Sequence, residues 1–258
     1  MEQPKQILIA GTGKLAEALL SLLHRVPDLE LFLWGRNEIA VNRLRDAYRF
    51  QSDYSNSLGK MPVLLCVSDN AISEVAETLK FSASCMVHFS GSMSIDVLPE
   101  TIREKAVCWP IQTFGNPLAV NWSEVPLCIE VPGQEAQEFM AWLCATLGGP
   151  CFSLTEEKRR ALHLAAIVAN NFTNHLMNLS KRYCEEQQIP FEQLLPLLRQ
   201  TIGQLSENDP QKLQTGPARR NDQTTIQKHL DMLQNEAELS EIYRLFSSQI
   251  TNRYSSEK

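Results

Sequence analysis

Two glycines near the N-terminus have the spacing of a phosphate-holding turn. An apolar run at residues 7–10 leads directly into Gly11-Thr12-Gly13-Lys14-Leu15-Ala16. In such a GxGxxA pattern the first glycine permits a tight turn, the second leaves room for a pyrophosphate, and the small last residue lets a helix pack closely on a sheet. The first turn of that helix offers free N–H groups to an anion. These six residues predict a dinucleotide-binding loop, with a ligand-free glycine turn as the alternative.

The end of the next apolar run bears on the choice between NAD and NADP. An NAD-selective site usually has Asp or Glu there, about 20 residues past the glycines, to hold the ribose 2′-OH. This chain instead has Trp34 followed by Gly35, Arg36 and Asn37. Because arginine can bind a phosphate through two parallel hydrogen bonds, Arg36 is placed to hold a 2′-phosphate. We predict NADP as the cofactor and place residues 35–37 in its site, with a solvated surface charge as the alternative for Arg36.

Polar residues follow three further apolar runs. Ligands of open α/β sheets bind beyond the carboxyl ends of the strands, so residues at these ends should face one crevice. We expect cofactor contacts from Val67, Ser68 and Ser90, and substrate contacts from Gln112 and Thr113. Capping of a helix or turn is the alternative for Asp69, Asn70, Ser90 and Ser92.

Hydride transfer to a carbonyl or imine needs a proton donor near the receiving carbon, and histidine and lysine are common donors. The Lys–Asn pair, four residues apart, of hydroxyacid dehydrogenases with similar architecture is missing from this chain. His163 shares one face of a predicted helix with Asn170, inside the otherwise apolar LHLAAIVANNFTNHL segment. We predict catalytic or substrate-contacting roles for His163, Asn170, Asn171 and His88. For each of them, a hydrogen-bonded structural role is the alternative.

The polar loop at residues 215–222, TGPARRND, is a further candidate for substrate binding. Arg219 and Arg220 could hold a carboxylate or phosphate, and Asp222 could orient one of them. Irregular segments between helices often carry function. Helix capping by Asp222 and ordinary surface charge for the arginines are the alternatives.

Short apolar runs alternate with helix-like segments up to about residue 154. The runs predict strands at 6–10, 30–34, 62–67, 85–89, 106–109, 127–131 and 151–154, with helices from 14 and at 38–48, 71–79 and 134–147. Beyond this point the strand pattern disappears. Thr155 can cap a helix of about 30 residues, because no glycine or proline interrupts residues 151–189. We expect further helices at 190–205, from 210, at 224–234 and at 236–250.

This alternation predicts an α/β protein. Residues 1–154 should form a Rossmann-like, doubly wound parallel sheet that binds the cofactor. Residues 155–258 should form an all-α domain for substrate binding and dimerisation, and the two domains should share a cleft.

Composition excludes several classes of protein. The chain has 258 residues and a net charge of −6, and residues 1–154 hold 11 Lys/Arg against 17 Asp/Glu. An acidic surface does not favour nucleic acid. Local N–H groups and Arg36, rather than long-range attraction, must therefore hold a polyanionic cofactor. No apolar run reaches the ~18 residues of a membrane span, and the N-terminus lacks the pattern of a signal peptide.

The seven cysteines include no CxxC pair, and no cluster has metal-ligand spacing. We expect most of them to be small buried residues of a cytoplasmic protein, without metal or disulfide roles.

Six segments occur together in a recognisable order: GTGKLA, VHFSGS, PIQTF, LHLAAIVANNFTNHL, TGPARRND and TTIQKHLDML, spanning Gly11 to Leu233. With them the chain resembles a bacterial family of Rossmann-like NADP-dependent oxidoreductases whose helical C-terminal half is known only as a domain of unknown function. The resemblance implies a helical domain similar to those of 6-phosphogluconate dehydrogenase, ketopantoate reductase and pyrroline-5-carboxylate reductase. In such relatives this domain commonly builds a homodimer.

Two positions depart from that family. Members often carry His before the PIQTF-like segment, where this chain has Trp109, and often read TGPxxRGD, where this chain has Arg220-Asn221-Asp222. The first departure removes a possible acid/base group, and the second replaces a flexible glycine.

We predict an oxidoreductase that passes a hydride between NADP(H) and a small polar metabolite. A non-catalytic NADP-binding sensor or regulatory protein is one alternative, favoured by Trp109 and the missing Lys–Asn pair. A cyclic-imine reductase of the pyrroline-5-carboxylate reductase type is the other. The polar stripe on the helix that carries His163 favours an enzyme.

Overall fold

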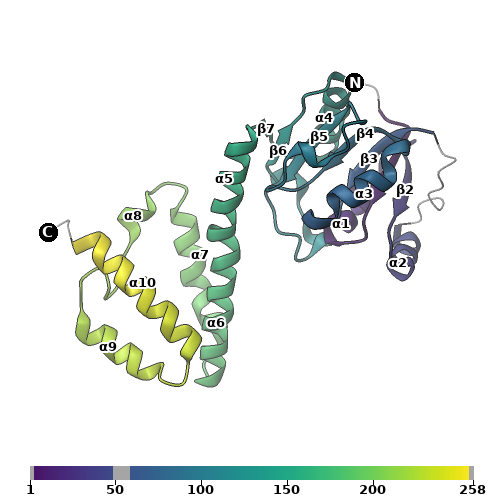
Figure 1. Ribbon diagram of the computed structural model, residues 1–258. Coiled ribbons are helices and arrows are strands. Elements are labelled where there is room, and N and C mark those ends of the chain that lie inside the picture. The colour runs from purple at the N-terminus through teal and green to yellow at the C-terminus, as the bar shows by residue number, and fades with distance from the viewer. Residues whose placement is uncertain (1–2, 49–58, 256–258) are drawn as a thin grey trace. The chain divides into compact units, whose positions relative to one another are not determined.

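A computed structural model describes residues 3–48 and 59–255 of the chain (Figure 1). Residue contacts divide it into two units, 1–167 and 168–258. The first unit, here called the sheet unit, contains every strand of the described residues, and the second, the helical unit, contains helices only. This confirms the predicted class, a Rossmann-like sheet followed by helices, whereas the predicted domain boundary at residue 154 stays a prediction.

The sheet unit is built on seven strands in the order β2-β1-β3-β4-β5-β6-β7. The strands are β1 (Gln6–Ala10), β2 (Glu30–Trp34), β3 (Met61–Leu65), β4 (Ala83–His88), β5 (Lys105–Pro110), β6 (Leu127–Glu130) and β7 (Cys151–Ser153). The order reverses between β1 and β3, because the chain moves outward from β1 to β2 and then returns to β1's other side. Open α/β sheets bind ligands at such a reversal.

Helices cover both faces of the sheet, as a doubly wound fold requires. They are α1 (Lys14–Leu23), α2 (Glu38–Tyr48), α3 (Ile72–Leu79) and α4 (Gln134–Leu147), and α5 (Glu156–Ala166) follows β7. Side chains of β1 alternate between two buried clusters: Ile7 and Ile9 pack with residues of α1 and α4, and Leu8 and Ala10 pack with residues of α3. Burial on both faces explains why β1 is an unbroken apolar run.

The last two strands run opposite to the first five, because β7 pairs with β6 in the parallel sense. β6 pairs with β5 in the antiparallel sense, with Val107 opposite Glu130 and Pro110 opposite Leu127. A parallel return needs a crossover connection, usually a helix. Only the short 3-10 turns Pro117–Ala119 and Trp122–Glu124 lie between these strands, so the chain returns directly.

The cysteines correct one sequence prediction. Cys144, in α4, and Cys151, in β7, form a disulfide with their Cα atoms 6.5 Å apart, so the expectation of no disulfide role is wrong for this pair. Spacing did not reveal it, because the pairing depends on how α4 returns to the sheet edge. The other five cysteines are free and buried, as predicted. Burial raises the pKa of the Cys85 and Cys108 thiols to about 12, which keeps both protonated.

The predicted helix of about 30 residues is present. Thr155 caps α5, accepting a hydrogen bond from the Lys158 N–H at 3.4 Å. The helical run then continues through a π-helical stretch at Ile167–Phe172 into α6 (Thr173–Glu186). Such π-bulges are uncommon and occur often at functional sites.

The helical unit continues with α7 (Leu195–Gln204), α8 (Pro210–Leu213), α9 (Gln223–Met232) and α10 (Ala237–Ser255). α9 and α10 pack against each other (Figure 1). Few residues of this unit are buried, among them Leu179, Ile226 and Leu233. A unit with so small a core leaves much apolar surface uncovered.

Candidate functional site

The turn between β1 and α1 is packed against β3. Gly11 has a φ of 125° and donates its N–H to the Trp34 carbonyl at 2.8 Å. A Cβ at this position would collide with the carbonyl oxygen of Cys66. Only glycine combines this positive φ with so close an approach of two backbones. The turn is therefore fixed in the crevice where the strand order reverses.

Gly13 has the opposite environment. It is the N-cap of α1 with extended backbone, and no side chain in the described residues caps the helix there. A Cβ added to Gly13 would meet nothing within 4 Å. The first N–H groups of α1 therefore face open space, and together with the helix dipole they can bind an anion. Ala16 is fully buried, which lets α1 lie close to the sheet as predicted.

The segment after β2 adjoins this turn. A Cβ at Gly35 would lie 2.7 Å from Cγ2 of Thr12, so glycine is needed for the two loops to touch. Arg36 is 65% exposed and lies 3.6 Å from Glu74 of α3. Asn37 caps α2 by accepting the Ala40 N–H at 3.0 Å. A surface pocket of about 420 Å³ opens beside Gly35.

A chain of hydrogen bonds joins the ends of β3 and β4. The Ser92 hydroxyl donates to Oδ2 of Asp69 at 2.6 Å, and its oxygen lies 3.3 Å from the Ser90 hydroxyl. Because the Ser92 proton points to the carboxylate, Ser90 is the donor in the second contact. Ser90 Oγ also accepts the N–H groups of Ser92 and Met93, each at 3.1 Å. We call residues 90–93 the serine loop.

Val67 and Ser68 lie at the same end of β3. Val67 is half-buried, and its Cγ1 would lie 3.3 Å from a Cβ at Gly11. Ser68 is exposed. Val67 therefore flanks the glycine turn, and the cofactor contacts of both residues stay predictions.

His88 is fully buried below the serine loop. Its Nδ1 accepts the Ser90 N–H at 3.2 Å, so the ring must be neutral at that atom. Burial and the positive charge of Arg159 lower its pKa to about 4. This geometry is more typical of a residue that positions the loop than of one that contacts a substrate. The catalytic role of His88 stays a prediction.

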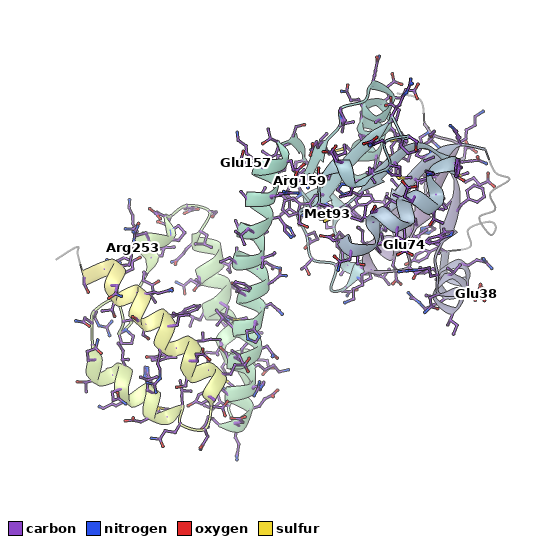
Figure 2. The ribbon with its side chains drawn as sticks, viewed as in Figure 1. Glu38, Glu74, Met93, Glu157, Arg159 and Arg253 are labelled. Carbon is purple, nitrogen blue, oxygen red and sulfur yellow. A yellow bond between two sulfur atoms is a disulfide. The ribbon has the colours of Figure 1, made fainter. Side chains whose placement is uncertain are left out.

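Arg159 is the feature that sequence reasoning missed. Its side chain is fully buried, on α5, and its Nη2 pairs with Glu130 at 3.1 Å. Nη1 donates to carbonyls of the serine loop, and Figure 2 shows the side chain beside Met93. Arginine is mostly exposed in proteins, and nothing in the EEKRR segment distinguishes Arg159 from its neighbours.

His163 lies one turn further along α5. Its ring meets Trp109 edge to face with centroids 5.3 Å apart. Its Nδ1 is enclosed and has no hydrogen-bond partner in the described part of the chain. A Cβ at Gly91 would lie 2.6 Å from this atom, so His163 packs directly on the serine loop. The histidine expected at position 109 from the family resemblance is thus replaced by an aromatic ring that packs on another histidine.

The remaining predicted residues are exposed or have local partners. Gln112 and Thr113 are exposed after β5. Asn170 and Asn171 are exposed in the π-helical stretch and bond to each other at 3.2 Å. Their role as substrate contacts stays a prediction.

The loop at 215–222 is organised by local contacts. Asp222 caps α9 through the N–H and hydroxyl of Thr225, at 3.0 and 2.7 Å, and these bonds lower its pKa. Arg219 stacks on Tyr254 with its guanidinium carbon 4.4 Å from the ring centroid. Arg220 is exposed. Asn221 has a φ of 56°, so it supplies the left-handed conformation for which the family uses glycine.

The sheet unit thus brings together the glycine turn, residues 35–37, Val67, the serine loop, His88 and His163. Asn170, Asn171 and the residues of loop 215–222 belong to the helical unit. In the described ranges no group of three or more His, Cys, Asp or Glu could hold a metal. No described helix is long and apolar enough to cross a membrane.

Comparisons with known proteins agree with this geometry. Residues 125–250 match the family model "Domain of unknown function (DUF2520)". A protein from Bacteroides fragilis described as a putative NADP oxidoreductase is 28% identical; the match covers 96% of this chain and 98% of that one, with a TM-score of 0.85. No curated protein matches the chain.

Two more distant structures share the fold. A protein from Thermotoga maritima is 21% identical over 97% of this chain and 99% of its own, with a TM-score of 0.68. A 1-pyrroline-5-carboxylate reductase from Streptococcus pyogenes is 16% identical over 96% and 98%, with a TM-score of 0.60. These two structures confirm the Rossmann-like fold expected from the sequence motifs, and the family model together with the Bacteroides fragilis protein confirms the resemblance.

Proposed function

We propose that this protein is an NADP-dependent oxidoreductase acting on a small polar metabolite. The observation that carries the proposal is the turn between β1 and α1. Gly11 fixes it against β3, while Gly13 leaves the N–H groups at the start of α1 uncapped and open. An open helix N-terminus at the reversal of a parallel sheet is a site for a dinucleotide's pyrophosphate.

The residues around this turn fit the cofactor. Residues 11–16 would hold the pyrophosphate through backbone N–H groups, and Val67 and Ser68 would flank it. NADPH, when bound, supplies a hydride to an electrophilic carbon of the substrate. The serine loop, at the carboxyl end of β4, would line the reacting end of the cofactor, with Ser90 as its cofactor contact.

Arg36 supports NADP over NAD. It is placed after β2, where an NAD-selective site has a carboxylate, and its ion pair with Glu74 is exposed on both sides. Such surface pairs contribute little stability. A 2′-phosphate, which can accept two hydrogen bonds from one guanidinium, would therefore displace Glu74 at small cost.

The second candidate function is that of a cyclic-imine reductase, and the hydrogen bonds that link Asp69, Ser92 and Ser90 favour it. A hydroxyl is a weak acid, and an imine nitrogen takes up a proton more readily than a carbonyl oxygen does. A hydroxyl next to the cofactor could therefore hydrogen-bond the imine nitrogen while solvent supplies the proton, so that imine reduction would not need a stronger acid. The fold shared with a 1-pyrroline-5-carboxylate reductase is consistent with this chemistry.

His163 is the alternative proton donor, because its ring packs on the serine loop beside Gly91. For substrate contacts we retain Gln112, Thr113, Asn170, Asn171, Arg219, Arg220 and Asp222 as proposals.

A screen for turnover tests the proposal. NADPH oxidation would be followed with a panel of cyclic imines and small 2-oxo acids, using Gly13→Ser as the control that should not bind cofactor. Oxidation with at least one compound, absent in the control, supports an oxidoreductase. Tight NADPH binding without turnover over the whole panel would favour the non-catalytic sensor, as Trp109 and the missing Lys–Asn pair do.

We also propose a homodimer formed through the helical unit. Large apolar side chains of this unit are at least 43% exposed: Val168, Phe172, Ile189, Leu197, Ile202, Leu205, Met232, Leu245 and Phe246. Monomers rarely leave so much apolar surface open. Sedimentation at several protein concentrations tests this. We propose the cytoplasm as the location: the five free thiols favour a reducing compartment, although the Cys144–Cys151 disulfide is of a kind that is rare there.

A further inference from the structure

Two arginines of α5 occupy every backbone carbonyl of the serine loop. Arg159 Nη1 donates to the carbonyls of Ser90 and Gly91, each at 3.1 Å, and of Met93 at 2.8 Å. Arg160 Nε donates to the Ser92 carbonyl at 2.9 Å. Four consecutive carbonyl groups thus accept hydrogen bonds from side chains of one helix.

The two arginines differ in burial and in their ion pairs. Arg160 is 53% exposed and also pairs with Glu156. Arg159 is fully buried, and in the described part of the chain its ion-pair partner is Glu130. A buried ion pair is often no more stabilising than apolar side chains of the same size. Attachment of α5 to the sheet alone would therefore not require Arg159.

The bonds of Arg159 constrain the loop instead. Its guanidinium holds the carbonyl side of the loop, while Asp69 holds the hydroxyl of Ser92 at 2.6 Å from the β3 side. The loop is thereby fixed from both directions at the carboxyl end of β4. Arg159 also acts through His88, because its charge disfavours a second proton on the ring that accepts the Ser90 N–H.

We propose that Arg159 is a positioning residue: it fixes the conformation of the serine loop so that the Ser90 and Ser92 hydroxyls stay aligned for the bound cofactor. This inference rests on the proposed function, because it assigns the loop to the NADP site. Arg159 itself is buried and touches neither cofactor nor substrate.

Arg159→Lys tests the proposal, since lysine keeps the charge but offers a compact ammonium that cannot span the three carbonyls and Glu130 as a planar guanidinium does. Amide hydrogen exchange would be measured across the serine loop, and NADPH and NADH affinities by fluorescence titration. We expect faster exchange in the loop and NADPH binding about tenfold weaker, the scale of one lost charge-assisted hydrogen bond. The ratio of NADPH to NADH affinity should not change, because Arg36 sets it.

Lys158→Met is the matched control, since it removes an exposed cation from the same helix, next to Arg159. It should leave loop exchange and both affinities as in the wild type. If Arg159→Lys does not fold, the same two measurements are made on Glu130→Gln. This variant removes the negative charge that pairs with the Arg159 guanidinium. The inference predicts faster loop exchange and at least a twofold loss of NADPH affinity in that variant.

Two results would overturn the inference. One is a folded Arg159→Lys protein, or Glu130→Gln in its place, that binds NADPH as tightly as the wild type; Arg159 would then only attach α5 to the sheet. The other is unchanged loop exchange in the same variant. Failure of the wild-type protein to bind NADPH is a separate outcome, which contradicts the proposed function and is seen before any variant is made.

Discussion

His163 and Trp109 meet edge to face beside Gly91, with ring centroids 5.3 Å apart and ring planes at 75°. A Cβ at Gly91 would lie 2.6 Å from the histidine Nδ1 and 2.7 Å from Trp109 Cε2. The two rings therefore close over the backbone of the serine loop and leave no room for a side chain.

Gly91→Ala should overpack this contact and lower the free energy of unfolding by about 1–3 kcal/mol. His163→Ala would remove one of the two rings that the new methyl group meets, so the double variant should be more stable than the sum of the two single effects predicts. Urea unfolding of the wild type and the three variants measures this coupling. Strictly additive effects would show that His163 and position 91 are not in contact.

Gly13→Ser should separate folding from cofactor binding. Serine is a good N-cap, and Gly13 already has a suitable backbone, with φ −78° and ψ −179°, and open space at its Cβ. The variant should be at least as stable as the wild type without ligand, yet gain no thermal stability from NADPH, because the side chain takes the phosphate's place. Gly11→Ala is the counterpart, and its collision with Cys66 should destabilise the fold itself. Full NADPH stabilisation of Gly13→Ser would remove the pyrophosphate from this turn.

His88 should make the free energy of unfolding depend on pH between the ordinary pKa of histidine and about 4. The folded state lowers this pKa, so between these values the unfolded chain binds more protons and stability falls as pH falls. From pH 6.5 to 4 the free energy of unfolding should fall by an amount of order 3 kcal/mol. His88→Gln should flatten this part of the profile relative to the wild type in denaturant titrations at a series of pH values. Parallel profiles would mean that His88 is not buried as a neutral ring.

The disulfide predicts a thiol count. Without reductant the denatured protein should show five reactive thiols, and after reduction all seven. Replacing Cys144 and Cys151 by serine should cost about 2 kcal/mol, the chain-entropy value for so short a loop. Seven thiols before reduction would show that the pair is not bonded.

The sequence was most informative where chemistry depends on neighbours in the chain. GTGKLA predicted the turn, its strand and its helix, because a glycine motif fixes local backbone geometry. The alternation of apolar runs with helix-like segments predicted the sheet, because strand and helix patterns are also read from neighbouring residues. The antiparallel β6 and the disulfide were not predicted, since both depend on where the chain returns to the sheet edge.

Long-range packing explains the rest of what was missed. The bonds of Arg159 reach carbonyls 66 to 69 residues earlier in the chain, and no local pattern indicates such contacts. The exposure of Asn170 and the stacking of Arg219 on Tyr254 likewise depend on which helix faces are covered. Residue types identified the candidates, but only the fold shows which of them lie together.

The most direct test of the account is a titration of the wild type and Arg36→Ala with NADPH and with NADH. We predict that the wild type binds NADPH tighter by about tenfold or more, the value of a charge-assisted hydrogen bond to the 2′-phosphate. Arg36→Ala should lose this preference while its NADH affinity stays the same. Arg43→Ala, which removes another exposed arginine near the turn, should keep the preference. Equal affinity for both dinucleotides in the wild type, or a preference that survives in Arg36→Ala, would contradict the account.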